Sequence, residues 1–417
     1  MEKVIAVGLV LPDLTYNVAE EHLEELTKLI ETAGGTVVER VLAKRPRPDP
    51  AHFVGSGKAE EINQLAMAFD ATLVVFDDDL SPAQARNLEK IIGVKVIDRS
   101  GLILAIFAGR ARSREARTQV ELAQLEYMLP RLTKQWTHLS RQAGGIGTRG
   151  VGETQLETDR RIVRTRISRL KEDLGKIEQT RETQRKARQA AFTVAIVGYT
   201  NAGKSTLFNR LTHGTADAVD RLFATLDAKS QKAAFEMPRD TVIIDTVGFI
   251  RKLPHDLVAS FRSTMEEAVA ADLVLHVMDG SHPQVSEQRE IGDEVLADLG
   301  IDPERVIEVF NKVDLVEQDV SHERRSERVR VSALTGKGIE ALVDVIRGRE
   351  REGGSVMQIE IPHEDSRTAA RLHELADVLD QTVTDHVTIF KAWVPQHAVH
   401  LFASYSAEKS LGRAKVS

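Results

Sequence analysis

Apolar residues in the first hundred positions follow two alternating spacings. Short apolar runs, typical of buried strands, alternate with segments in which apolar residues recur every three or four positions, as on one face of a helix. The predicted strands are residues 4–10, 37–42, 72–76 and 94–97, and the predicted helices are residues 20–33, 57–69 and 81–92. Strands that alternate with helices form crossover connections and a parallel sheet. An α/β domain is therefore predicted over residues 1–110.

Two helical patterns with heptad spacing follow over residues 111–190. The first has apolar residues at Leu122, Leu125, Leu129, Leu132, Trp136 and Leu139, and the second at Leu156, Val163, Ile167, Leu170, Leu174 and Ile177. The glycine-rich stretch AGGIGTRGVGE separates them. This pattern predicts a long antiparallel helical hairpin with a glycine-rich tip. Pro130 is expected to kink the first arm, and a second arm of about 35 residues would span about 50 Å.

The α/β alternation returns over residues 191–350, and a shorter region follows over residues 355–417. Gly353 and Gly354 are interpreted as a linker between the two regions. In the shorter region the pattern predicts a strand at 356–361, a helix at about 366–379, and strand-like runs at 387–394 and 398–402. A small α+β domain is therefore predicted there.

Composition limits the classes of protein that fit. Hydrophobic residues make up 42% of the chain, there is no cysteine, and the longest apolar run is residues 102–108, far short of the roughly 18 residues that indicate a membrane span. The first residues lack the pattern of a secretion signal. We expect a monomer in the cytoplasm without a membrane span, with partial membrane association left open.

Charge is distributed unevenly along the chain. Between Arg110 and Arg188 there are 19 Lys and Arg against 10 Asp and Glu, a local charge of +9, whereas the whole chain carries −7. A solvated helical surface could account for this composition. An electrostatic surface for nucleic acid is at least as good an interpretation, because a positive face on an acidic protein attracts phosphates.

A phosphate-binding loop lies in FTVAIVGYTNAGKSTLFNRL. Gly198 and Gly203 bracket the loop, Lys204 and Ser205 complete the motif, and an apolar strand precedes it while a helix follows. The glycines let backbone N–H groups surround phosphates, the lysine supplies positive charge to the β and γ oxygens, and the serine ligates Mg²⁺. Asn201, Ala202 and Thr206 are also assigned to the nucleotide.

Guanine recognition is predicted from VIEVFNKVD, which ends a strand with Asn311, Lys312 and Asp314. The Asp314 carboxylate can accept hydrogen bonds from both N1–H and the amine of guanine, whereas adenine lacks this pair of donors. A site built for those donors rejects adenine because its polar groups would be left unpaired. Ser332, Ala333 and Leu334, after the next strand, are assigned to the same base.

The segments that respond to the γ-phosphate are predicted between these motifs. Thr225 would complete the Mg²⁺ shell, Asp245 would support the metal, and Gly248 would donate its N–H to the γ-phosphate. Lys204, Thr225 and Gly248 are the candidate catalytic residues. Phe249 stands where many GTPases have a glutamine that orients the attacking water, and a phenyl ring cannot do so.

One further glycine-rich stretch, HFVGSGKAEE, has the appearance of a phosphate loop around Gly57 and Lys58. The first glycine of the motif would fall on His52, and the metal-binding hydroxyl residue would be Ala59. Because neither residue fits the chemistry, we predict a tight turn into a helix.

The stretch GGIGTRGVGETQLETDRR, residues 144–161, closely resembles the signature of the HflX family of ribosome-associated GTPases, apart from Val151, where the family usually has proline. The resemblance extends upstream through VFDDDLSPAQARNLEK. It implies an α/β chain: an N-terminal α/β domain with a long helical hairpin, a Ras-like P-loop GTPase domain and a small C-terminal α+β domain. It also implies that GTP and GDP are ligands, that the large ribosomal subunit and its RNA are partners, and that the protein splits or rescues stalled ribosomes under stress.

The family also lacks the catalytic glutamine, so hydrolysis should be slow until the ribosome completes the site. The candidate RNA contacts lie at the hairpin tip and flank: Gly147, Thr148, Arg149, Arg160, Arg161 and Arg164. In related GTPases an asparagine at the place of Asn201 helps hold a monovalent cation, which suggests K⁺; an asparagine that only fixes the loop is equally consistent. Two other functions stay open: a GTPase of ribosome assembly, and a GTP-gated RNA-binding module with negligible turnover.

Overall fold

A computed structural model describes residues 2–132, 151–187, 191–214, 222–223, 229–237, 240–252, 265–316, 328–396 and 398–406. The chain separates into two compact units. The first comprises Met1–Gln179 with two short segments from later in the chain, Asp220–Asp227 and Ile250–Ser263. The second comprises Thr180–Val219, Ala228–Phe249 and Thr264–Ser417.

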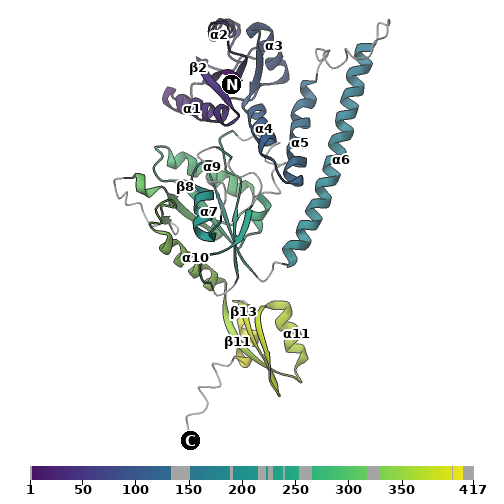
Figure 1. Cartoon of the computed structure of the whole chain (residues 1–417), viewed down its shortest axis with the longest axis vertical. Helices are drawn as coiled ribbons and strands as arrows, with labels where there is room; N and C mark the ends of the chain where they lie inside the picture. Colours follow the sequence, from purple (N-terminus) through teal and green to yellow (C-terminus); the bar gives the residue numbers. More distant parts are fainter. Residues whose placement is uncertain are drawn as a thin grey trace. The chain divides into compact units, whose positions relative to one another are not determined.

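The first unit contains a four-stranded parallel sheet in the order β2-β1-β3-β4. Its strands are β1 (Glu2–Val10), β2 (Gly35–Lys44), β3 (Leu73–Phe76) and β4 (Lys95–Asp98), and its helices are α1 (Tyr16–Thr32), α2 (Ser56–Phe69), α3 (Pro82–Ile92) and α4 (Arg99–Arg110). The core includes Ile5, Val74 and Phe76, which are fully buried. The predicted α/β alternation is confirmed (Figure 1).

Local chemistry explains where these helices begin. Ser81 caps α3: its side chain accepts from the N–H of Gln84, whose own side chain accepts from the N–H of Ser81. Such a reciprocal pair satisfies two N–H groups that a helix leaves unbonded at its start. Asp98 caps α4 in a similar way, by accepting from the N–H of Gly101 at 2.9 Å. The polar residue at the end of β4 thus starts the next helix.

The stretch with the appearance of a second phosphate loop is a tight turn, as predicted. Gly55 has φ of +88° and directly precedes α2. A Cβ at this position would lie 2.1 Å from Nη1 of Arg45, so only glycine fits between the turn and that side chain. The turn therefore serves to start a helix.

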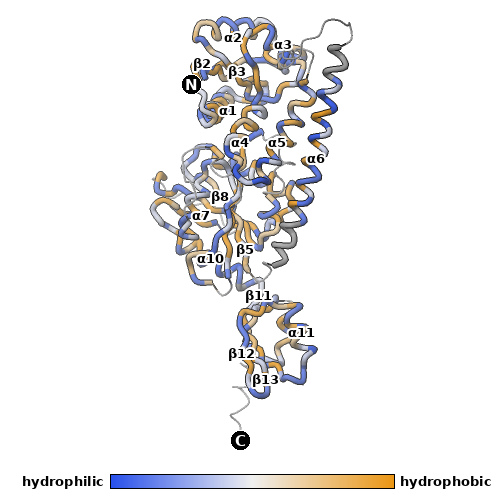
Figure 2. Tube along the Cα trace, turned by 45° about the vertical axis from the view of Figure 1, so that its right-hand side comes forward, coloured by the Kyte–Doolittle hydropathy of each residue, from blue (hydrophilic) through white to orange (hydrophobic). Residues whose placement is uncertain are grey.

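The helical hairpin consists of α5 (Arg114–Met128), the 3-10 turn η1 (Leu129–Arg131) and α6 (Val151–Ala187). Helices α5 and α6 lie side by side in both views (Figure 1, Figure 2). Arg166 pairs with Glu121 at 2.7 Å and Lys171 with Glu126 at 2.8 Å, so the arms are joined by ion pairs. With 37 residues, α6 spans about 55 Å at 1.5 Å per residue.

The first arm is shorter than its heptad pattern predicted. α5 ends at Met128, the backbone then forms the single turn η1, and Leu132 has extended backbone angles. Pro130 lies within that turn, and proline has no N–H to donate to the preceding turn, so the hydrogen bonding of the α-helix is interrupted there. The interruption at Pro130 agrees with the expected kink, but the heptad pattern continues to Leu132, where the backbone is no longer α-helical. The later part of the predicted arm lies outside the described residues.

The second unit contains a six-stranded sheet in the order β10-β9-β8-β5-β7-β6, in which only the β6–β7 pair is antiparallel. The strands are β5 (Phe192–Gly198), β6 (Lys229–Lys232), β7 (Thr241–Asp245), β8 (Leu273–Asp279), β9 (Val306–Asn311) and β10 (Arg328–Arg330). The helices are α7 (Lys204–Thr212), α9 (Val285–Asp298) and α10 (Ile339–Gly353), with the short turns η3 (Pro303–Arg305) and η4 (Val313–Leu315).

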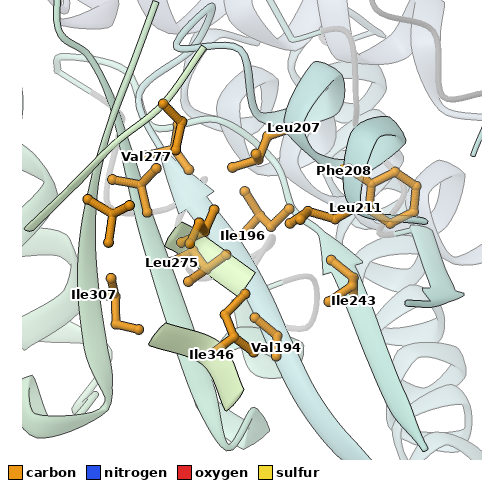
Figure 3. Packing of buried hydrophobic residues seen from close by; sticks show 14 of the residues in the cluster. Val194, Ile196, Leu207, Phe208, Leu211, Ile243, Leu275, Val277, Ile307 and Ile346 are labelled. Atoms are coloured by element: carbon orange, nitrogen blue, oxygen red, sulfur yellow. The ribbon is translucent and has the colours of Figure 1, made fainter. Parts of the chain in front are cut away.

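Helices α7 and α10 both contribute to the core of this sheet. Figure 3 shows Leu207 and Phe208 of α7 and Ile346 of α10 packed with side chains of the central strands. Ile196 of β5 and Leu275 of β8 lie at the centre of this cluster and are fully buried. The packing fixes α7 against the sheet, directly after the predicted phosphate loop.

The end of the described chain is a small α+β region whose elements correct three predictions. It consists of β11 (Gly354–Pro362), α11 (Ser366–Leu375), β12 (Asp377–Val383), β13 (Val387–Pro395), α12 (Val399–Phe402) and η5 (Ala403–Tyr405), with the sheet order β11-β13-β12. Gly353 and Gly354 do not form a linker, since α10 runs directly into β11. The helix predicted to about residue 379 ends at Leu375, and residues 398–402 form a helical turn instead of a strand.

Packing against β13 explains two of these differences. Gly354 pairs with Pro395 in the sheet, and a Cβ at Gly354 would lie 2.5 Å from the carbonyl of Val394. A glycine that allows close approach of two strands looks the same in sequence as one that loosens a linker. Asp377 likewise pairs with Trp393, so that pairing with a later strand ends the helical pattern.

Candidate nucleotide-binding site

The predicted phosphate loop connects β5 to α7, and its shape requires its glycines. Gly198 has φ of +140°, and a Cβ there would lie 2.0 Å from the carbonyl oxygen of Val277. Gly203 has φ of +88°, and a Cβ there would lie 2.2 Å from Nδ2 of Asn311. Asn201, which is exposed, has φ of +62°. The loop therefore turns tightly and leads into the N-terminus of α7, where backbone N–H groups and the helix dipole favour phosphate.

Lys204, the first residue of α7, is buried, with 7% of its surface exposed. Its Nζ donates to the carbonyl of Tyr199 at 2.8 Å, within the loop. Burial lowers the pKa of Lys204 to about 8, and the nearby carboxylate of Asp245 only partly offsets this effect. The site thus holds a cation that is poorly solvated until an anion enters.

Ser205 and Asp245 lie together beside this lysine. Ser205 Oγ donates to Oδ2 of Asp245 at 2.8 Å, and Asp245 is fully buried at the end of β7. A hydroxyl and a carboxylate at the mouth of a phosphate loop suit Mg²⁺, which takes oxygen ligands and shares them with substrate phosphates. Ser205 could thus ligate the ion directly, with Asp245 in support. Thr225, the other predicted ligand, lies outside the described residues.

Gly248, the predicted donor to the γ-phosphate, lies against the phosphate loop. A Cβ at Gly248 would lie 2.8 Å from Nζ of Lys204 and 2.8 Å from Cγ2 of Thr200, so a larger residue would push into the phosphate loop. The N–H of Phe249 donates to the carbonyl of Gly198 at 2.9 Å, and its carbonyl accepts from the N–H of Thr200 at 2.7 Å. These bonds tie the segment to the loop on both sides.

The side chain of Phe249 belongs to the core. It is 2% exposed, and its ring lies edge-on to His276, with 6.3 Å between ring centroids. A glutamine here would have to leave this packing to reach a phosphate-bound water. The structure therefore places a packing residue at the position where many GTPases have the group that orients water.

Asn311 joins the phosphate loop to the predicted guanine-binding segment. It ends β9, its Nδ2 donates to the carbonyl of Ala202 at 2.9 Å, and its Oδ1 accepts from the N–H of Ala333 at 2.9 Å. Asp314, two residues beyond Lys312, is exposed, as a carboxylate that must meet a base should be. Ser332 is fully buried, whereas the side chain of Leu334 is 72% exposed.

Asp279 and Arg210 are parts of this arrangement that sequence reasoning missed. Asp279 ends β8, and its Oδ2 lies 2.7 Å from Nζ of Lys312. Burial would raise the pKa of Asp279, but hydrogen bonds from Lys312 and Ser281 hold it below its ordinary value. A signal that could have indicated Asp279 is its place directly after the apolar run LVLHVM, within the region of predicted α/β alternation. For Arg210, whose partners are more than a hundred residues away in the chain, the sequence carries no signal.

The candidate RNA contacts differ in their surroundings. Gly147, Thr148 and Arg149 lie outside the described residues. Arg161 and Arg164 are exposed on α6. Arg160 is half-buried, and its Nη2 donates to the carbonyl of Leu132 at 3.1 Å. Arg160 therefore helps to join the two arms of the hairpin, a role that the sequence did not indicate.

Two basic residues that follow Gly248 closely take part in an ion-pair network of the first unit. Nζ of Lys252 lies 2.6 Å from Oδ2 of Asp77, and Nε of Arg251 lies 3.5 Å from Oε2 of Glu25. The buried Arg99 joins the two carboxylates, because its guanidinium pairs with both Asp77 and Glu25. Burial disfavours the charge on Lys252, but its carboxylate partners outweigh that effect and hold the pKa of Lys252 above its ordinary value.

Within the described residues, no helix combines the length and the apolar character needed to cross a membrane. Nor do those residues contain a cluster of three or more His, Asp or Glu side chains that could hold a metal ion by themselves.

Comparison with known proteins shows what the chain is similar to. Three family models match it: GTP-binding GTPase N-terminal over residues 20–108, GTP-binding GTPase Middle Region over residues 110–188, and 50S ribosome-binding GTPase over residues 193–312. GTPase HflX of Escherichia coli K12 is 46% identical over 364 residues, which cover 85% of each chain. GTPase HflX of Caldanaerobacter subterraneus is 44% identical over 377 residues, which cover 90% of this chain and 88% of that protein.

A crystal structure of a GTP-binding protein from Sulfolobus solfataricus in complex with GDP is 24% identical to this chain, with a TM-score of 0.44. The match covers 84% of this chain and 98% of that one.

Proposed function

The chain belongs to the HflX family of GTPases, and from that premise we propose that it is a nucleotide-gated factor that binds the large ribosomal subunit and splits or rescues stalled ribosomes. It is a GTP hydrolase with a ribosome-binding type of GTPase domain. In the proposed cycle the GTP-bound form acts on the ribosome, the ribosome accelerates hydrolysis, and the GDP form leaves. Ser205 and Thr225 would hold Mg²⁺ against the phosphates.

The proposed gating rests on the ion pairs that Arg251 and Lys252 form within the first unit. Gly248 would sense the γ-phosphate, and the chain reaches Lys252 only four residues later. Lys252 and Arg251 are ion-paired to Asp77 and Glu25 of the first unit. Asp77 and Arg251 are buried, although Lys252 is exposed, so breaking either pair would leave a buried charge without that partner, which is costly. A change at Gly248 on nucleotide exchange would therefore act directly on the N-terminal region.

Phe249 supports slow hydrolysis without a partner. Because its ring is packed in the core, the nucleotide site lacks a water-orienting side chain at this position. Completing such a site from outside accelerates GTPases by about 10³- to 10⁵-fold. The exposed Arg161 and Arg164 on α6 offer the positive charge that would hold the protein against ribosomal RNA.

Sedimentation of ribosomal subunits tests this function. Assembled ribosomes are expected to dissociate into subunits when they are incubated with the protein and either GTP or a non-hydrolysable analogue. They should stay assembled when GDP replaces GTP. Large subunits added alone should raise multiple-turnover hydrolysis by at least about tenfold. If hydrolysis is stimulated but assembled ribosomes stay intact, the splitting function is wrong and a GTPase of ribosome assembly becomes the better account. If no turnover is stimulated, a GTP-gated RNA-binding module fits better.

A monovalent cation is a further part of this proposal, through Asn201. Asn201 is an exposed residue of the phosphate loop, and its side chain could help hold K⁺ beside the β and γ phosphates. Such a charge would act during phosphoryl transfer as an arginine finger does. We expect hydrolysis to be several-fold faster in K⁺ than in Na⁺ at equal ionic strength, and this preference should disappear in Asn201→Ala. Equal rates of the parent in the two salts would mean that the asparagine only shapes the loop.

A further inference from the structure

Arg210 connects α7 to the predicted guanine-binding loop. Its Nε donates to the carbonyl of Ala333 at 3.1 Å, and its Nη2 donates to the carbonyl of Leu334 at 2.5 Å. One planar guanidinium thus holds two consecutive carbonyls, a fork geometry that lysine cannot reproduce. Gly336, with φ of +91°, lies against the same guanidinium, with its Cβ position 3.8 Å from Cζ.

Within the described part of the chain, the exposed side of the loop at Ala333 and Leu334 makes few hydrogen bonds other than those from Arg210. The side chain of Leu334 is 72% exposed, and Asp314, across the predicted base site, is exposed as well. The backbone of Ser332 is held by later residues of the same loop: its N–H donates to the carbonyl of Lys337 and its carbonyl accepts from the N–H of Gly336, both at 2.8 Å. The position of Ala333 and Leu334 therefore depends on hydrogen bonds made by the side chains of other residues.

Asn311 and Arg210 both bond to the backbone at Ala333 and Leu334. Asn311 also contacts the phosphate loop, and Arg210 lies on the helix that follows this loop. Asn311 accepts from the N–H of Ala333 and donates to Ala202 of the phosphate loop. Arg210 holds the carbonyls of Ala333 and Leu334 and lies six residues after Lys204 on the same helix. Six residues of helix span about 9 Å. Helix α7 thus sets the separation between the phosphate end and the base end of the site.

We propose that Arg210 is a positioning residue for guanine selection: it fixes the Ser332–Ala333–Leu334 loop at the distance from Lys204 that a guanine nucleotide requires. Arg210 acts through the backbone of the loop without touching the nucleotide. The inference concerns nucleotide binding and stands independently of the ribosomal function proposed above.

Arg210→Ala should release the loop and leave the phosphate loop in place. We expect the affinities for GTP and GDP to fall together by about five- to thirtyfold, which corresponds to the loss of one or two charge-assisted hydrogen bonds at an exposed position. KM for GTP should rise by a similar factor while kcat at saturating GTP stays within about twofold, because the groups around the γ-phosphate are unchanged. The affinity for ATP, which the guanine loop does not favour, should stay as it is in the parent, so that the selectivity for GTP over ATP falls.

Two further variants separate positioning from a general effect on folding. Arg210→Lys can reach one carbonyl and should recover part of the affinity. Arg347→Ala is the matched control, since Nε of Arg347 donates to the carbonyl of Glu236 at 3.0 Å in the same unit but away from the loop. Nucleotide affinities by fluorescence titration, with thermal unfolding of each variant, measure these effects. The proposal is overturned if folded Arg210→Ala binds GDP within about twofold of the parent, if Arg347→Ala shows the same loss, or if kcat falls while KM is unchanged.

Discussion

Lys204→Ala is expected to abolish tight binding of GTP and GDP. Lys204 is the buried cation of the phosphate loop, and its Nζ donates to the carbonyl of Tyr199 at 2.8 Å. We expect phosphate oxygens to replace this neutral partner when a nucleotide binds. Removal of a charge-assisted hydrogen bond in a buried site, together with an unpaired phosphate charge, should weaken binding by at least about a hundredfold. Equilibrium titration with a fluorescent GDP analogue measures the loss, and unfolding of the free protein shows that the fold is retained.

The pH dependence of the parent protein tests the same lysine without a mutation. The pKa of Lys204 is lowered by burial to about 8 in the free protein, whereas bound phosphate favours the charged form and raises it. GTP affinity should therefore change little between about pH 7, above the second pKa of a phosphate, and pH 8, and should fall as the pH rises further, approaching roughly tenfold per unit. The titration is made below the pH at which the guanine N1 proton itself is lost. An affinity of Lys204→Ala equal to that of the parent would disprove the assignment of the phosphate site.

Thr148→Ala combined with Arg149→Ala is expected to abolish ribosome splitting while leaving nucleotide binding intact. These residues belong to the glycine-rich stretch of the sequence and lie outside the motifs assigned to the nucleotide, so we expect the substitutions to remove no group that surrounds the phosphates. GTP affinity and hydrolysis without ribosomes should stay within about twofold of the parent values. Arginine and threonine recognise RNA by charge, stacking and hydrogen bonds, so the loss should appear in the sedimentation profile of ribosomal subunits. Splitting at the parent rate would mean that the tip is only a connection between helices.

Arg161→Ala combined with Arg164→Ala should instead weaken binding to the large ribosomal subunit. The affinity of this double variant should also depend less steeply on salt concentration than that of the parent. Both side chains are exposed, and a protein that neutralises fewer RNA phosphates releases fewer counterions on binding. Lys90→Ala with Lys95→Ala removes the same charge from exposed positions outside the hairpin and is the matched control. Arg160 is kept unchanged because it bonds to the carbonyl of Leu132. Equal effects of the two double variants would argue for a general effect of net charge.

The sequence by itself determined those features that depend on periodicity or on one residue's backbone freedom. The alternation of apolar runs and helical spacings indicated the parallel sheets of both units, since a buried strand and a half-buried helix impose different repeats on the chain. The glycines of the phosphate loop could be predicted because Gly198 and Gly203 adopt backbone angles that other residues rarely reach. Asn311, Lys312 and Asp314 were predicted as a guanine-binding segment from a short motif after an apolar strand.

The tertiary structure decided wherever one residue's role depends on a partner far along the chain. Gly354 is a strand residue because β13 approaches it, and the C-terminal helix ends at Leu375 because the next residues pair with the same strand. Phe249 is a core residue because His276 and the phosphate loop enclose it. The partners of Arg210 and Lys252 lie 123 to 175 residues away. Sequence spacing carries no record of such contacts, because the closing of long loops brings the partners together only when the sheets have packed.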